Sequence, residues 1–175
     1  METPGCALII TPHPDDAEIA CRGVVANWIK HGATVHYVLC SDGSKGTEDP
    51  NMTPDHLREI RYQEQKDAAC VLGVTNVIAL KYLDGELEDT KEFRGLIVKA
   101  IRTLRPDVVI SPDPHRRSFY LHRDHRITGV VTQAAGFPYA RDLSRIHNSE
   151  PPRRYAMGDS VVGLKKRMGG GGGGG

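Results

Sequence analysis

Two short clusters of histidine and aspartate contain the side chains of this sequence that are best suited to chemistry. His13, Asp15 and Asp16 lie in the stretch TPHPDDAE, directly after the apolar run ALII. The second cluster is HRDH, at residues 122–125. Each cluster alone is also explained by a helix start, because aspartate caps backbone N–H groups and acidic side chains suit the positive end of the helix dipole.

Taken together, the two clusters predict a metal site. His13 and Asp16 are three residues apart across a strand-to-helix turn, so their side chains can converge, and His125 follows the fourth predicted strand. Two histidines and one carboxylate leave a position open for water, as in catalytic zinc sites. The same ligands also form the facial triad of iron oxygenases. Asp15, beside a ligand, is then free to accept a proton from that water.

The elements that must position these residues alternate along the chain. Short apolar segments rich in β-branched residues predict buried parallel strands at residues 6–10, 33–40, 76–80 and 107–111. Apolar residues at helical spacing predict helices at residues 17–31, 55–72, 93–104 and 124–135. This alternation predicts a Rossmann-like α/β fold, an open and mostly parallel sheet with helices on both faces.

Polar clusters follow each predicted strand. The first strand leads into HPDD, the second into Ser41-Asp42-Gly43, the third into Leu83-Asp84-Gly85, and the fourth into residues 112–125. Ligands of open α/β sheets bind outside the carboxyl ends of the strands. The sequence therefore places its unusual polar residues where a ligand is expected.

These residues resemble the motifs of a known family, the LmbE-like or PIG-L zinc-dependent N-deacetylases. The first family motif is present as Pro12-His13-Pro14-Asp15-Asp16, and the second as residues 122–125, where Arg123 replaces the usual proline. Arg61 with Glu64, and the Leu83-Asp84-Gly85 segment, also match. The resemblance covers roughly residues 5–136, and the family includes N-acetylglucosaminyl-phosphatidylinositol de-N-acetylase.

The resemblance implies a hydrolase that removes the acetyl group from an N-acetylglucosamine-like amide. Zinc, or another divalent metal such as Fe²⁺, would be held by His13, Asp16 and His125. Asp15 would be the general base for the metal-bound water. The resemblance makes Tyr120 the oxyanion donor. His122 would stabilise charge or protonate the leaving amine, and Asp124 would orient a histidine. Arg61 and Asp84 would bind sugar hydroxyls.

Several of these residues also have plainer interpretations. Tyr120 could pack its ring at the sheet edge, and Asp84 before Gly85 fits an ordinary turn. Arg61 and Glu64 could form only an ion pair on a helix surface. The alternatives for the whole chain are a catalytically inactive sugar-binding or assembly domain and, with less support, a non-haem iron oxygenase.

Composition favours one domain without nucleic-acid or membrane partners. The chain has 175 residues, 39% of them hydrophobic, and a formal net charge of +1. No apolar run approaches the ~20 residues that span a bilayer. Four cysteines without CxxC spacing indicate core residues in a reducing compartment, which predicts a cytoplasmic protein.

The domain organisation expected from the pattern is a deacetylase core at residues 1–136, a basic tail at 137–168 and a polyglycine end at 169–175. Members of the family usually continue with a further strand and helix. The shorter region here is compatible with a homo-oligomer in which another subunit completes the pocket. The expected partner is a small N-acetylated amino sugar or glycoconjugate.

Overall fold

The fold is an open sheet in a computed structural model that describes residues 2–115, 122–140, 155–157 and 162–163. Within these residues the strand order is β3-β2-β1-β4-β5-β6. All neighbouring strands are parallel except β5 and β6, which are antiparallel. The Rossmann-like, mostly parallel sheet is thereby confirmed. The strands are β1 (Cys6–Thr11), β2 (Thr34–Ser41), β3 (Asn76–Tyr82), β4 (Val108–Ser111), β5 (Tyr155–Met157) and β6 (Val162–Gly163).

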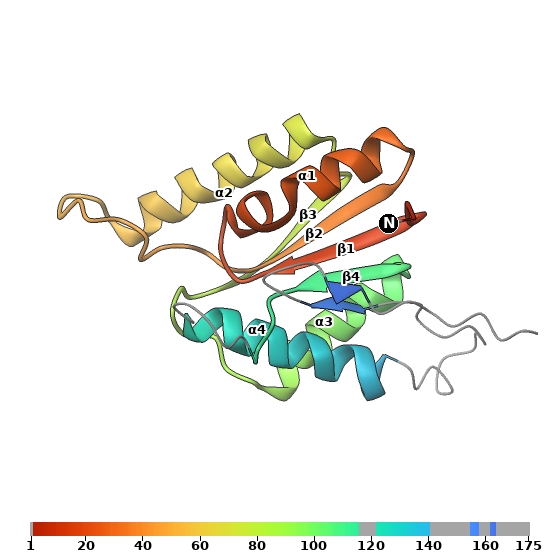
Figure 1. Ribbon diagram of the computed structural model, residues 1–175. Coiled ribbons are helices and arrows are strands. Elements are labelled where there is room, and N and C mark those ends of the chain that lie inside the picture. The colour runs from red at the N-terminus through yellow and green to blue at the C-terminus, as the bar shows by residue number, and fades with distance from the viewer. Residues whose placement is uncertain (1, 116–121, 141–154, 158–161, 164–175) are drawn as a thin grey trace, which may run out of the picture.

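The helices cover both faces of this sheet, as the sequence predicts. In Figure 1, α1 (Asp16–Lys30) and α2 (Pro54–Leu72) lie on one side, and α3 (Lys91–Leu104) and α4 (Arg123–Ala134) lie on the other. A kinked continuation, Ala135–Tyr139, follows α4. The threonines that precede α2 and α3 each accept a backbone N–H of the first turn, which explains where these helices begin.

Two apolar cores hold the layers together. On the first face, Trp28 and Val25 of α1 pack against β1 and β2, and Ala69 of α2 joins them. On the second face, Phe93 and Ile97 of α3 pack against the opposite side of the same strands, beside residues of α4. β1, β2 and β4 are therefore buried on both sides, which explains why their sequences are largely apolar rather than alternating, whereas β3 at the edge of the sheet is only half-buried.

The structure differs from the sequence expectation in two places. The short β5 was not predicted, because the segment around it shows no apolar periodicity. All four cysteines are free, but they are not all core residues. Cys21 and Cys40 are buried, Cys6 is half-buried, and Cys70 on α2 is exposed.

The parallel arrangement brings the carboxyl ends of the strands to one edge. Ile9 of β1 pairs with Tyr37 of β2 and with Ile110 of β4, so the segments after these strands lie side by side. The polar clusters predicted to meet at this edge belong to these segments. Among the described helices, none combines the length and the apolar composition that crossing a membrane requires.

Candidate metal centre

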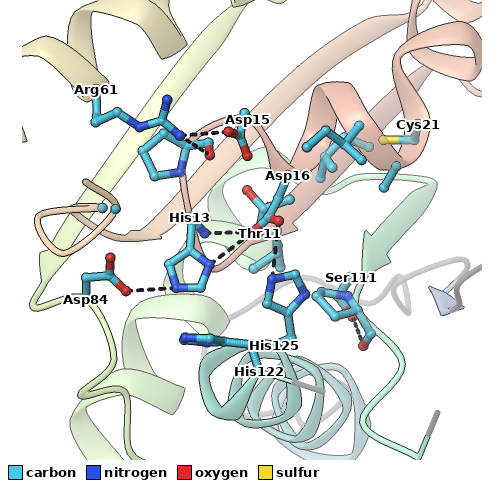
Figure 2. A pocket seen from close by; sticks show the side chains of 18 of the residues that line it. Thr11, His13, Asp15, Asp16, Cys21, Arg61, Asp84, Ser111, His122 and His125 are labelled. Carbon is cyan, nitrogen blue, oxygen red and sulfur yellow. Dashed lines mark hydrogen bonds and ion pairs between the residues drawn. The ribbon is translucent and has the colours of Figure 1, made fainter. Parts of the chain in front are cut away.

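His13, Asp16 and His125 converge at the carboxyl edge of the sheet, as the sequence predicts. His13 follows β1, Asp16 begins α1, and His125 lies in the first turn of α4 (Figure 2). His13 Nδ1 is 3.4 Å from Asp16 Oδ2, and His125 Nε2 is 3.2 Å from Asp16 Oδ1. One ligand atom from each residue lies within 4.8 Å of the others.

This donor set fits a divalent metal ion. Atoms bound to a tetrahedral zinc at about 2.0–2.2 Å are about 3.4 Å from each other. The two separations that involve Asp16 run to different oxygens of its carboxylate, and one ligand atom from each of the three residues lies within 4.8 Å of the others. Two imidazoles and a carboxylate are also the ligand types of catalytic zinc and of non-haem iron.

The electrostatics of the cluster favour the charged carboxylate. Burial opposes ionisation of Asp16, but hydrogen bonds with His125 and His13 outweigh it and hold the pKa of this carboxyl well below its ordinary value. Burial likewise lowers the pKa of His13, but the hydrogen bond with Asp16 and the neighbouring carboxylates outweigh it, so the pKa of His13 is raised. Asp16 is therefore available as an anionic ligand at neutral pH.

The other nitrogen of His13 faces two further carboxylates. His13 Nε2 is 3.1 Å from Asp84 Oδ1 and 3.2 Å from Asp124 Oδ2. Asp124 is fully buried, and it also accepts the backbone N–H groups of Gly85 at 2.7 Å and Leu87 at 3.3 Å. A histidine that binds a metal commonly donates its other N–H to a carboxylate. His13 can thus offer Nδ1 to an ion while Nε2–H is held by these aspartates.

A second group of potential ligands consists of His13, Asp84 and His122. It shares His13 with the first group. Because Asp124 also lies beside His13 Nε2, a hydrogen bond from Nε2–H explains this side of the ring without a second ion.

Asp15 lies beside the cluster but points away from it, as expected. Its carboxylate is 2.7 Å from Arg61 NH2, and half of the side chain is exposed (Figure 2). It precedes α1, yet its side chain makes no capping hydrogen bond, so the helix-cap interpretation is wrong for Asp15. Its backbone is in the left-handed region, with φ 79°. The two adjacent aspartates therefore do different things in the structure.

Arg61 forms the ion pair on its own helix and also contacts the HPDD turn. One guanidinium nitrogen is 3.0 Å from Glu64 on the same helix, and the other bonds Asp15 and, at 3.2 Å, the carbonyl oxygen of Pro14. Asp84 does precede a turn, with Gly85 at φ 75°, but its carboxylate also contacts His13. Sequence reasoning did not predict that contact.

A cavity of about 680 Å³ surrounds the cluster. In Figure 2 the cluster lies between Arg61 and Asp84 on one side and Cys21 and Ser111 on the other. The loop after β2 closes the polar side, where Gly43, Lys45 and Gly46 line the cavity. A Cβ on Gly43 would lie 2.9 Å from Pro14 Cδ, so glycine permits this loop to approach the HPDD turn.

The remaining predicted residues have different outcomes. His122 precedes α4, where its Nδ1 accepts the Asp124 N–H at 3.2 Å, and its ring centroid is 4.7 Å from that of His13. Tyr120 lies outside the described residues. Sequence reasoning missed Gln65, which bonds the backbone of Asp15, and Asp42, which accepts the backbone N–H of Asp84. No local pattern marks either contact, because each joins distant segments.

Comparisons with known proteins agree with this geometry. The model of the PIG-L family, described as GlcNAc-PI de-N-acetylase, matches residues 8–135. Diacetylchitobiose deacetylase of Thermococcus kodakarensis is 37% identical over 155 residues, which are 86% of this chain and 58% of that protein. The solved structure of N,N'-diacetylchitobiose deacetylase from Pyrococcus horikoshii superposes with a TM-score of 0.80 at 32% identity, over 88% of this chain and 60% of that one.

A solved hydratase from Pseudomonas putida shares the fold, with a TM-score of 0.76 at 21% identity. This likeness extends to the fold alone. The chain spans about 60% of the length of the deacetylases that it matches.

Proposed function

Because the chain belongs to the PIG-L family of de-N-acetylases, we propose that it is a metal-dependent hydrolase that removes the acetyl group from an N-acetylated amino sugar. The observation that carries this proposal is the convergence of His13, Asp16 and His125 in a cavity that Asp15 also lines. The deacetylases among the similar proteins support the choice of substrate class.

We propose His13, Asp16 and His125 as the metal ligands and zinc as the ion, with Fe²⁺ also compatible with these donors. An ion bound there supplies Lewis acidity towards the amide carbonyl and lowers the pKa of water. Asp124 holds the Nε2–H of His13, which keeps Nδ1 directed at the ligand position.

Asp15 is the proposed general base. Its carboxylate lines the cavity, where it can accept the proton of the water that attacks the acetyl carbon. Arg61 binds this carboxylate at 2.7 Å and would keep it in place. The new C–O bond and the broken C–N bond yield acetate and the free amine, which takes up a proton.

The remaining roles belong to residues around this centre. His122 lines the cavity beside His13 and would deliver the proton to the leaving amine. Arg61 and Asp84 line the side on which a sugar would hydrogen-bond through its hydroxyl groups. Tyr120 remains a proposal drawn from the motif, as the donor to the oxyanion.

The test uses Asp15→Asn, with Asp67→Asn on the exposed surface of α2 as the control. Acetate release from N,N'-diacetylchitobiose and N-acetylglucosamine should fall about 10²–10⁴-fold in Asp15→Asn, with one metal ion per chain retained. Asp67→Asn should behave as wild type. Full activity in Asp15→Asn would show that the base is assigned wrongly. Sugar binding with metal present but no hydrolysis in wild type would indicate an inactive binding domain.

The ligand assignment has its own test. His13→Ala and His125→Ala should lose both the metal, measured by elemental analysis, and the activity. Stoichiometric zinc in either variant would contradict the ligand set.

We also propose a cytoplasmic location, which the four unpaired cysteines support. A homo-oligomer that completes the cavity is a further part of the proposal. Light scattering during size exclusion would determine the oligomeric state.

A further inference from the structure

The divergence of Asp15 and Asp16 depends on the backbone at Asp15. Adjacent residues at the start of a helix would ordinarily follow one another around its axis. Here the left-handed conformation at Asp15, φ 79°, turns its carboxylate towards Arg61, while Asp16 faces His13 and His125. A residue other than glycine rarely adopts this conformation, so surrounding contacts must hold it in place.

Gln65 makes such a contact. Its side chain lies on α2, is 3% exposed, and accepts the backbone N–H of Asp15 through Oε1 at 2.9 Å. At the other end of the amide, Nε2 donates to Glu18 Oε1 at 3.0 Å. Because a backbone N–H can only donate, the orientation of the Gln65 amide is determined, and both of its ends are used.

Arg61 and Gln65 together hold Asp15 at two points. They are four residues apart on α2 and therefore lie on the same face of that helix. Arg61 binds the carboxylate of Asp15, and Gln65 accepts the backbone N–H of Asp15. Of the two adjacent aspartates, Gln65 bonds the one whose backbone has the strained, left-handed conformation.

We propose that Gln65 is a positioning residue, which acts through the Asp15 backbone to keep the base and the metal ligand on separate sides of the turn. This inference rests on the proposed function. Without the acceptor at position 65, the Asp15 peptide is free to relax from the left-handed conformation. Its carboxylate then leaves the cavity wall, whereas Asp16 is still held by the N–H of His13 at 2.9 Å.

The decisive variant is Gln65→Leu, and the chain provides a matched control. Gln63 lies on the same helix, is exposed, and donates to the side chain of Asp67 at 2.8 Å. Gln65→Leu should lower kcat about 10–100-fold, the usual cost of losing a supporting contact. KM for the acetylated sugar and the bound metal should stay near wild type. Gln63→Leu should change none of these quantities.

A second measurement does not depend on activity. Amide hydrogen exchange of the HPDD segment, followed by mass spectrometry in the metal-loaded protein, should become faster in Gln65→Leu and not in Gln63→Leu. The double variant Glu18→Gln with Gln65→Glu keeps an acceptor at position 65 for the Asp15 N–H and reverses the bond between positions 65 and 18, because position 18 then donates. It should recover both the protection and most of the lost kcat.

Wild-type kcat and wild-type exchange in a folded Gln65→Leu protein would overturn the inference. A raised KM with unchanged kcat would also contradict it, because the contact would then serve substrate binding. If Gln65→Leu does not fold, the double variant decides, since a folded protein that stays slow refutes the role. Lack of deacetylase activity in wild type would instead refute the proposed function, and the exchange measurement would still test the Asp15 contact.

Discussion

Gly129 determines how closely α4 approaches the loop after β4. It lies one turn after His125 on the same helix, and it is buried. A Cβ at this position would lie 2.4 Å from the carbonyl oxygen of Pro112 and 2.8 Å from Pro114 Cδ. Because the first of these atoms belongs to the backbone, Gly129→Ala requires the helix or the loop to move.

Two opposing effects determine the result of Gly129→Ala. Alanine in place of glycine stabilises a helix interior by about 0.8–1.0 kcal/mol. Overpacking of a buried contact costs about 1–3 kcal/mol. The expected net loss of unfolding free energy is up to about 2 kcal/mol. At roughly 2–4 °C per kcal/mol for a chain of this size, Tm should fall by up to about 4–8 °C.

The displacement should also weaken metal binding. His125 Nε2 is 3.2 Å from Asp16 Oδ1, and moving α4 outwards separates these two ligands. Metal affinity should fall about 10–100-fold, as it does when groups that orient ligands are lost. Competition with a chelating dye would measure the affinity, and thermal unfolding of the metal-free protein would measure Tm.

Two other helix glycines provide controls with the opposite expected sign. Gly23 in α1 and Gly95 in α3 are exposed, and a Cβ on either would meet nothing within 4 Å. Gly23→Ala and Gly95→Ala should therefore raise Tm by about 2–4 °C and leave metal affinity unchanged. If Gly129→Ala stabilised the protein as these variants do, with native metal affinity, the close approach at α4 would be wrong.

Three further predictions concern stability. Burial opposes ionisation of Asp42, but hydrogen bonds from Ser44 and Arg58 outweigh it and lower the pKa of Asp42. At acidic pH the unfolded chain therefore binds more protons at this position than the folded protein does. The stability that Asp42→Asn loses should be fully present above about pH 4 and should shrink below it, in urea unfolding at pH 7 and pH 3. Phe93→Ala, at a side chain with no exposed surface, should cost about 3–5 kcal/mol in the same assay. Lys45→Ala breaks an ion pair whose side chains are both more than half exposed, and calorimetry should show a Tm close to that of wild type.

The fold could be predicted wherever one local pattern spans a whole element. Apolar runs indicate β1, β2 and β4 because these strands are buried on both faces, and the stripe on α3 indicates the face that packs against them. The apolar run of β3 also indicates a strand, although this edge strand is only half-buried. The short β5 has too few residues to show any period. Cys70 lies on the exposed side of α2, which its apolar neighbours in the sequence did not reveal.

The candidate site was predictable to the extent that residue type and strand order specify it. The topology rule alone brings His13 and His125 to one edge, and the metal-ligand types indicate the chemistry. The contacts of Asp84 with His13 and of Gln65 with Asp15 join distant segments, so no local residue spacing in the sequence predicts them. The positive φ of Asp15 was equally hidden from the sequence.

The long sequence separation within the metal centre has a consequence for the newly made protein. His13 and Asp124 are in contact although 111 residues separate them. During translation, the ribosome must add the residues between Asp16 and His125 before the third proposed ligand exists, which at bacterial to eukaryotic elongation speeds takes about 5–20 s. Until α4 emerges and docks, only two of the three proposed ligands, His13 and Asp16, are present. Metal loading at the proposed site would therefore follow assembly of the sheet.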